Sequence, residues 1–156
     1  MNILVSACLL GEPCRYDGRA KPCAAVQALA KQHRLVSVCP EVLGGLPTPR
    51  LPSELQRTGA GVRVVNVEGR DVTAAFERGA EIACQLAEDE GCAVAVLKSG
   101  SPSCGSETVY DGTFTGRMCR GEGVAAARLR GQGVVVIDEE HLGALPLEDG
   151  NDCQRE

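Results

Sequence analysis

Short, continuous apolar runs are the feature of this sequence that most limits its fold. Residues 2–7, 35–38, 93–97 and 134–137 are rich in Val, Leu, Ile and Ala and do not alternate between apolar and polar positions. Such runs are typical of strands that are buried on both faces, as in a parallel sheet covered by helices. Helical patterns separate the runs, and this alternation favours the α/β class. We therefore expect a single three-layer α/β domain with a mainly parallel, Rossmann-like sheet.

Three segments between these runs have helical composition, at residues 23–33, 71–90 and 121–130. Residues 61–67 predict a further strand, with a hairpin turn expected through Glu68 and Gly69. Residues 40–55 contain so many glycines and prolines that we expect irregular structure there, and residues 98–116 are expected to form a second long loop. Long irregular segments inside compact domains tend to carry function, so these two segments are where a site is expected.

The chain of 156 residues has the length of one domain. We expect residues 1–147 to form it and residues 148–156 to be a polar tail. The net charge of −5 gives no electrostatic reason to bind nucleic acid or an anionic membrane. No apolar run approaches the roughly 18 residues that span a bilayer. These properties predict a soluble cytoplasmic protein. We expect it to be a monomer or homodimer.

Cysteines follow the predicted strands at the end where ligands bind in α/β proteins. Cys8 and Cys39 come directly after a strand, and Cys104 lies in the loop after another. The carboxyl ends of parallel strands share one edge of the sheet, so these thiols are expected to meet there. Three thiolates can hold a [4Fe–4S] cluster and leave one iron with an open position. The alternative is that they are small buried apolar side chains, as free cysteines often are.

Cys14 follows Cys8 closely in the sequence and has two interpretations. It can reach the same metal as a fourth ligand, or it can act as a redox partner of Cys8. The remaining cysteines lie in or beside helical patterns, in a loop or in the polar tail, where packing is the simplest role. The lack of any Cys-x-x-Cys pair argues against a zinc ribbon and against a thioredoxin-like site.

Polar residues beside the cysteines are candidates for the chemistry. Glu41 lies two residues after Cys39, and a partly buried carboxylate beside a metal can act as a general acid or base. Ser101 and Ser103 precede Cys104 and can donate hydrogen bonds to cluster sulfides or to substrate. Each of these residues also has a simpler interpretation, as a solvated carboxylate or as an ordinary serine of a turn.

Two cationic residues are candidates for substrate binding. Lys98 stands at a strand end, where its ammonium group could orient an anionic or carbonyl group of a ligand. Arg50 lies among prolines and could anchor a ligand in the same way. The alternatives are a solvated lysine at the rim of the site and an arginine that braces its own loop.

Five segments of the chain resemble the family of TudS-like 2-thiouracil desulfidases. They are residues 5–11 (VSACLLG), 14–18 (CRYDG), 39–41 (CPE), 44–52 (GGLPTPRLP) and 98–105 (KSGSPSCG). The likeness extends over about residues 2–140, with no departure at these positions. In combination these motifs are specific to the family.

The resemblance implies a cofactor and its ligands. Members of the family are similar to one another in being α/β proteins that hold an oxygen-sensitive [4Fe–4S] cluster by three cysteines only. The matching residues of this chain are Cys8, Cys39 and Cys104. In some relatives Val occupies the position of Cys14, so the resemblance does not identify that residue as a ligand.

The activity implied by the resemblance is a desulfuration without net redox change, from 2-thiouracil to uracil and hydrosulfide. The open iron of the cluster binds the sulfur of a thiolated nucleobase or nucleoside. Glu41 matches the acidic residue of the family and is expected to activate water, while Ser101 binds substrate or relays a proton. Lys98, Ser103 and Arg50 are expected to contact the substrate.

Two other functions stay open on the residues alone. In a non-catalytic metal-binding protein, Cys14 completes a set of four ligands and closes the site. In a thiol-redox protein, Cys8 and Cys14 form a reversible disulfide, and the activity survives without iron. The spectrum of the bound metal and the iron dependence of the activity separate these two classes from a desulfidase.

Overall fold

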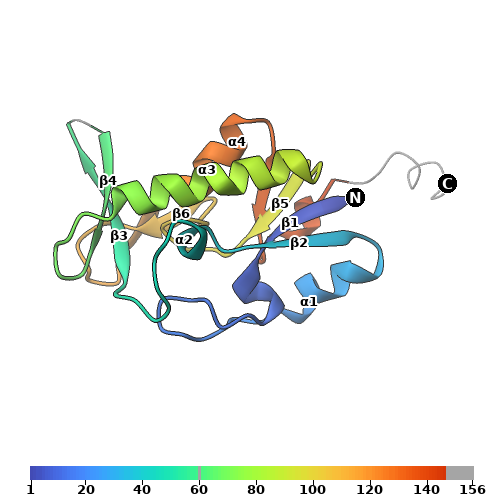
Figure 1. The fold of residues 1–156 in the computed structure, drawn as a ribbon, viewed down its shortest axis with the longest axis horizontal. Coiled ribbons are helices and arrows are strands. Elements are labelled where there is room, and N and C mark those ends of the chain that lie inside the picture. Colours follow the sequence, from blue (N-terminus) through green and yellow to red (C-terminus); the bar gives the residue numbers. More distant parts are fainter. Residues whose placement is uncertain (60, 147–156) are drawn as a thin grey trace.

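The structure is a computed structural model that describes residues 1–59 and 61–146. The predicted polar tail, residues 148–156, lies outside this part of the chain. A four-stranded parallel sheet forms the centre, in the order β2-β1-β5-β8 (Figure 1). Its strands are β1 (Asn2–Ser6), β2 (Arg34–Val38), β5 (Val94–Leu97) and β8 (Val135–Asp138). These strands coincide with the four apolar runs of the sequence, which confirms the predicted α/β class and its parallel Rossmann-like sheet.

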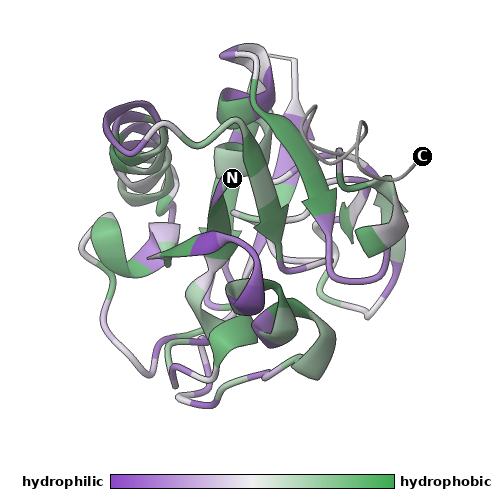
Figure 2. Ribbon diagram, turned by 90° about the vertical axis from the view of Figure 1, so that its right-hand side faces the viewer, coloured by the Kyte–Doolittle hydropathy of each residue, from purple (hydrophilic) through white to green (hydrophobic). Residues whose placement is uncertain are grey.

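Both faces of the sheet are covered, because side chains along each strand alternate between two apolar layers. In β1, Leu4 packs with residues of the long helix α3 (Thr73–Asp89) and of α4 (Val124–Gly131). Its neighbours Ile3 and Val5 belong to the layer on the other face. That face is covered by η1 (Ala7–Leu10), α1 (Ala24–Gln27) and η2 (Ala28–Lys31). In Figure 2 the strands of the central sheet are accordingly coloured as hydrophobic along most of their length.

Helix α3 buries a single stripe of side chains against the sheet and the neighbouring hairpin. The stripe consists of Phe76, Ala80, Ala83 and Ala87, each at most 1% exposed. Spacings of three and four residues place these side chains on one helix face. Within the part of the chain that the structure describes, no helix is both long and apolar enough to cross a membrane.

Two antiparallel hairpins extend the domain beyond the central sheet. In one, β3 (Ser53–Thr58) pairs with β4 (Gly61–Asn66), and in the other β6 (Thr108–Tyr110) pairs with β7 (Met118–Arg120). The turn predicted through Glu68 and Gly69 is present, because Val65 forms an antiparallel bridge with Asp71 and the N–H of Asn66 donates to the carbonyl oxygen of Arg70 at 2.9 Å. The strand that pairs with β4 along its length is nevertheless β3, which precedes it. After the turn, the chain continues into α3.

The segment expected to be irregular, residues 40–55, is partly regular. It begins with the short helix α2 (Pro40–Leu43) and ends in the first residues of β3. The sequence hides β3 because its letters, SELQRT, are mostly polar. Leu55 packs into a small cluster with Val64 and Phe76, whereas the end of the strand at Thr58 is exposed to solvent. Similarly, β6 interrupts the loop expected at residues 98–116.

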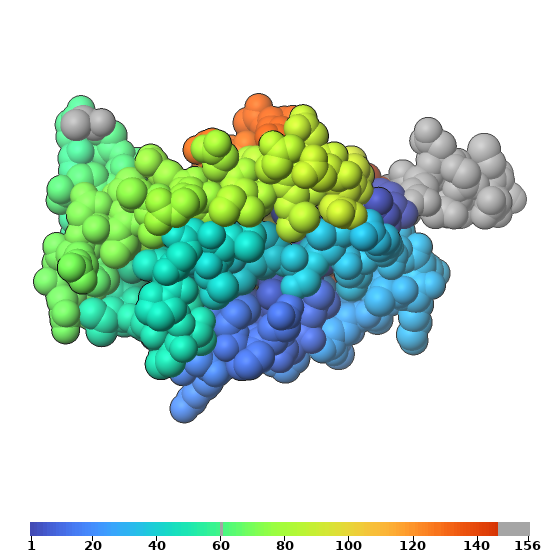
Figure 3. Space-filling model, viewed as in Figure 1, coloured from blue at the N-terminus to red at the C-terminus, as the bar shows by residue number. Residues whose placement is uncertain are grey.

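Helix α2 lies unusually close to α3, and glycines make this approach possible. A Cβ atom on Gly79 of α3 would lie 1.8 Å from the carbonyl oxygen of Pro40, and one on Gly44 would lie 2.0 Å from the carbonyl oxygen of Ala75. In Figure 3 the segment around residue 45 is wedged between α3 and the N-terminal loop. The contact fixes α2, and with it the residues on both sides of its first turn.

Candidate metal centre and active site

A cavity of about 290 Å³ opens at the carboxyl ends of the central strands. Its walls include Cys8, Cys39 and Cys104, together with Cys14. Cys8 lies in η1 directly after β1, Cys39 directly after β2, and Cys104 in the loop after β5. Neighbouring parallel strands thus bring together three thiols that are far apart in the sequence, at the edge of the sheet where α/β proteins bind ligands.

The three thiols suit a metal centre by their chemistry. All cysteines in the described residues are free, and Cys8 and Cys104 are only 7% and 5% exposed. Burial raises the pKa of Cys8 to about 11 and that of Cys104 to about 12. Each lies close enough to Cys39 for the charges to interact. Buried thiols of this kind become thiolates when a cation compensates them, so the donor set fits an iron–sulfur cluster held by three cysteines.

Cys14 lies beside Cys39 rather than beside Cys8 alone. The Sγ atom of Cys39 is 3.8 Å from the carbonyl oxygen of Cys14. A hydrogen bond from the Cys14 thiol lowers the pKa of Cys39, and the same contact raises the pKa of Cys14. Of the two sulfurs, Cys39 is therefore the better thiolate donor, and Cys14 is its proton-bearing neighbour.

Glu41, on the first turn of α2, forms an ion pair with Arg50. Nε of Arg50 donates to Oε1 of Glu41 at 2.9 Å, and the two side chains are only 7% and 13% exposed respectively. Arg50 also donates from Nη2 to the carbonyl oxygen of Cys14 at 2.9 Å and from Nη1 to Pro47 and Thr48. Most of the N–H donors of the Arg50 guanidinium group are therefore hydrogen-bonded to other groups of the protein.

Three side chains form a hydrogen-bonded chain that ends on Glu41. Ser101 Oγ accepts the backbone N–H groups of Ser103 at 3.1 Å and Cys104 at 3.0 Å. With both of its lone pairs in use, its own hydrogen is left to donate to Ser103 Oγ, 3.0 Å away. Ser103 Oγ in turn donates to Oε2 of Glu41 at 2.9 Å. The hydrogen bonds therefore run from Ser101 through Ser103 to the carboxylate.

Lys98 also lines the cavity, and its ammonium group has partners within the protein. It lies 3.3 Å from Oε2 of Glu139 and donates to the carbonyl and hydroxyl oxygens of Ser99 at 2.8 and 3.2 Å. Its positive charge acts on Cys8, where it opposes the rise in pKa caused by burial. This places a fixed cation next to the first of the three thiols.

Other residues of the cavity were not singled out as site residues by the sequence analysis. They include Glu54 of β3, Tyr16 in the loop after η1, and Tyr110 at the end of β6. Arg15 lies over the ring of Tyr16, with its guanidinium carbon 5.9 Å from the ring centroid. Tyr16 stands two residues after Cys14, which was the available signal for it, whereas β3 and β6 were not predicted at all.

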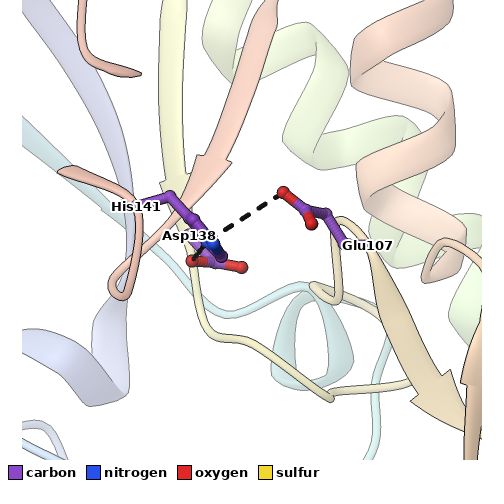
Figure 4. A group of neighbouring side chains, drawn as sticks. All are labelled: Glu107, Asp138 and His141. Carbon is purple, nitrogen blue, oxygen red and sulfur yellow. Dashed lines mark hydrogen bonds and ion pairs between the residues drawn. The ribbon is translucent and has the colours of Figure 1, made fainter. Parts of the chain in front are cut away.

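A second group of potential metal ligands does not line this cavity. It consists of Glu107, Asp138 and His141 (Figure 4). Nδ1 of His141 is 2.7 Å from Oδ1 of Asp138 and 3.9 Å from Oε2 of Glu107. The backbone N–H of Glu140 donates to the same Asp138 oxygen at 2.9 Å. Hydrogen bonds at the end of β8 account for this group, so no metal needs to be invoked for it.

Known proteins are similar to this chain along nearly its whole length. Residues 3–141 match the family of 2-thiouracil desulfurases. The chain is 40% identical over 149 residues to the uncharacterized protein YbbK of Bacillus subtilis (strain 168). The matched region covers 92% of this chain and 99% of that protein. A solved structure, described as the [4Fe–4S]-dependent thiouracil desulfidase TudS, superposes with a TM-score of 0.84 at 46% identity over 99% of both chains. The chain therefore belongs to the 2-thiouracil desulfurase family.

Proposed function

We propose that this protein is a [4Fe–4S]-dependent desulfidase that removes sulfur from 2-thiouracil or a closely related thiolated pyrimidine. The observation that carries the proposal is the meeting of three free thiols and a hydrogen-bonded carboxylate on one cavity, in a chain of this family. Cys8, Cys39 and Cys104 would hold the cluster. When bound, a cluster with three protein ligands supplies an iron with an open position, a soft Lewis acid suited to sulfur.

Glu41 is the residue placed to handle protons in this reaction. Hydrolytic loss of sulfur needs a water molecule to give up a proton as it attacks the ring carbon. The Arg50 guanidinium and the Ser103 hydroxyl each occupy one oxygen of the Glu41 carboxylate, which keeps it oriented. Each oxygen retains a second lone pair, so a water bound to either one can transfer its proton to Glu41.

The two serines hold the carboxylate that takes the proton. Ser103 donates to Oε2 of Glu41 and accepts from Ser101, whose own lone pairs are used by backbone N–H groups, so the hydrogen bonds run toward Glu41. Ser103 is the direct partner of the carboxylate, and Ser101 holds the turn that carries Ser103 and Cys104. We assign to Ser103 the orientation of the Glu41 carboxylate, with Ser101 behind it.

Lys98 and Arg50 act on the site mainly as fixed charges. Arg50 orients Glu41 and ties it to the loop of Cys14, and Lys98 places a cation beside Cys8. A positive charge near buried thiolates favours their ionised form. Contact of either residue with the substrate takes second place to these roles.

A free nucleobase or nucleoside suits the site better than intact nucleic acid. A cavity of about 290 Å³ is near the lower limit of small-molecule sites. The net charge of −5 does not favour a polyanion. We place the protein in the cytoplasm, as a monomer or homodimer, because a reducing compartment keeps its thiols free.

The test is sulfide release from 2-thiouracil by anaerobically reconstituted protein. Glu41→Gln should retain the absorbance of the cluster and lose turnover, because an amide cannot accept the proton of water. Glu81→Gln, on the exposed side of α3, is the matched control and should behave like the wild type. Sulfide release by iron-free protein at the rate of the loaded protein would refute the proposal.

The alternatives of a non-catalytic metal protein and of a thiol-redox protein are less favoured. The family and the solved relative both point to a desulfidase. The redox alternative also pairs Cys8 with Cys14, whereas Cys14 lies against Cys39, whose Sγ atom is 3.8 Å from the carbonyl oxygen of Cys14.

A further inference from the structure

Glu54 is a buried carboxylate that the proposed reaction does not use. It lies in β3, is 9% exposed, and lines the same cavity as the cysteines. Its Oε1 accepts hydrogen bonds from the backbone N–H groups of Gly112 at 2.9 Å and Phe114 at 3.1 Å. One carboxylate oxygen thus anchors the loop between β6 and β7. A neutral amide oxygen would serve equally well for that purpose, so the anchor does not explain the negative charge.

The second oxygen, Oε2, is available for a ligand in the cavity that Glu54 lines. Within residues 1–59 and 61–146 it has no hydrogen-bond partner. In the same part of the chain, no side-chain nitrogen or oxygen that is shielded from solvent lacks a partner. Oε2 is therefore accessible, and the space that Glu54 lines is the cavity. An anionic acceptor on an otherwise buried side chain is a site for a hydrogen-bond donor of the ligand.

Two aromatic side chains of the cavity suit a flat ring. The chain contains only two tyrosines, and both line this cavity. Tyr16 and Tyr110 are 40% and 41% exposed, so their rings are available for contact. Tyr110 stands directly before the loop that Glu54 anchors. Aromatic side chains that line a pocket offer apolar faces to planar ligands, while a few polar groups fix the orientation of the ligand.

We propose that Glu54 determines substrate specificity by accepting a hydrogen bond from a ring N–H of the substrate. The inference rests on the proposed function and narrows its substrate class to planar thiolactams with a protonated ring nitrogen. In 2-thiouracil, both nitrogens next to the sulfur-bearing carbon carry hydrogen. A ring methylated at both nitrogens leaves the carboxylate without a partner, and sites with unpaired buried polar groups reject such analogues strongly.

Glu54→Gln separates this role from the anchoring of the loop. The amide oxygen can still accept from Gly112 and Phe114, which turns the amide nitrogen toward the cavity. An N–H group of the ring then meets a donor instead of an acceptor. The variant should therefore keep the melting temperature of the wild type and lose affinity only for ligands with a ring N–H. Glu68→Gln, at an exposed turn beyond β4, is the matched control.

The measurement is titration calorimetry of cluster-loaded protein with uracil and with 1,3-dimethyluracil, which differ in their ring donors. Glu54→Gln should raise the Kd of uracil by about 10- to 100-fold and change that of 1,3-dimethyluracil less than about twofold. A matching rise in KM for 2-thiouracil, with kcat little changed, is expected. An equal change for both ligands, or none for uracil, would overturn the proposal and leave Glu54 as a loop anchor.

Two further measurements separate failure of this proposal from failure of the variant to fold and from failure of the proposed function. Wild-type protein should itself bind uracil at least about tenfold more tightly than 1,3-dimethyluracil, and equal affinities would contradict the proposal even if the variant failed to fold. Failure of the proposed function would appear separately, because sulfide release by the wild type is measured without reference to Glu54. The binding experiment needs no turnover.

Discussion

The Glu41 carboxylate and the Arg50 guanidinium form a largely buried ion pair, with 2.9 Å between Oε1 and Nε. Arg50 continues from Glu41 to the carbonyl oxygen of Cys14, so one side chain joins α2 to the N-terminal loop. Its backbone N–H also donates to the carbonyl oxygen of Tyr16 at 2.7 Å. The proposed proton acceptor and the wall of the cavity are thus held by the same residue.

Arg50→Lys should destabilise the protein although it preserves the charge. Lysine cannot reproduce the planar arrangement of donors that serves Glu41, Pro47 and Cys14 together. We expect a loss on the order of 2 kcal/mol in the free energy of unfolding, measured by urea denaturation. Arg63→Lys is the control, because its contact with Asp71 is exposed and 3.6 Å long; less than about 1 kcal/mol is expected there. Equal losses of unfolding free energy in the two variants would show that the buried guanidinium of Arg50 contributes no more to stability than the exposed one of Arg63.

Alanine substitutions of Ser103 and Ser101 should differ in their effects on turnover and on stability. Ser103→Ala removes the bridge to Glu41 and should lower kcat by roughly tenfold or more, with little effect on stability. Ser101→Ala also removes the acceptor for two backbone N–H groups, so it should cost about 1 kcal/mol of stability as well. Sulfide-release kinetics and thermal melts of both variants check this. A Ser103→Ala enzyme with wild-type kcat would eliminate this role of Ser103.

Gly79→Ala should destabilise the protein even though alanine is the better helix former. The gain in helix propensity is about 1 kcal/mol. Against it stands a Cβ atom 1.8 Å from the carbonyl oxygen of Pro40, which forces α2 away from α3. Overpacking of this kind commonly costs about 1–3 kcal/mol, and the backbone contact places this case at the upper end. Gly131→Ala, near the end of α4 with no atom within 4 Å of its Cβ position, should be neutral or slightly stabilising.

The central sheet was predictable because burial on both faces leaves an unmistakable pattern. The four apolar runs identify strands without knowledge of which strands pair. The rule that the carboxyl ends of parallel strands share one edge of the sheet then predicts that Cys8, Cys39 and Cys104 lie together. The hairpin strand β3 was not predictable, since its pairing with β4 and not its composition makes it a strand. Strand propensity depends on such neighbours more than helix propensity does.

The site was predictable only where it follows the sheet. Glu41 follows Cys39, but its ion pair with Arg50 depends on how the intervening loop folds back. The proline at the start of α2 occupies a position that favours helix initiation, and this signal could have located the helix. Glu54 and Tyr110 enter the cavity through β3 and β6, so no local pattern could identify them.

Protonation of His141 should stabilise the fold. A hydrogen bond to Asp138, reinforced by the charges of Asp138, Glu107 and Glu140, raises the pKa of His141 above its ordinary value of 6.5. Because the pKa is higher in the folded state, the stabilisation is complete below about 6.5 and is lost as the pH rises through the folded pKa. NMR titration of the imidazole should give a midpoint above 6.5, and Asp138→Asn should lower it. A midpoint unaffected by Asp138→Asn would contradict this assignment.

Substitution of Cys8, Cys39 or Cys104 should abolish cluster binding, whereas substitution of Cys14 should not. Cys8→Ser, Cys39→Ser and Cys104→Ser each replace a thiolate by a hard, weakly acidic hydroxyl, so anaerobic reconstitution should give little bound iron and little visible absorbance. Cys14→Ala should keep both, because the proposed set of ligands does not include Cys14, whose contact with Cys39 runs through its backbone carbonyl oxygen.

Cys84→Ala is the control for that comparison, since Cys84 is buried in the core away from the cavity. It should retain iron and lose only some stability, through the small void that it leaves. Iron content per chain and the absorption spectrum decide the matter without any activity assay. If Cys14→Ala loses iron as Cys8→Ser does, Cys14 closes the site as a fourth ligand. The open coordination position on which the proposed desulfidase depends would then be absent.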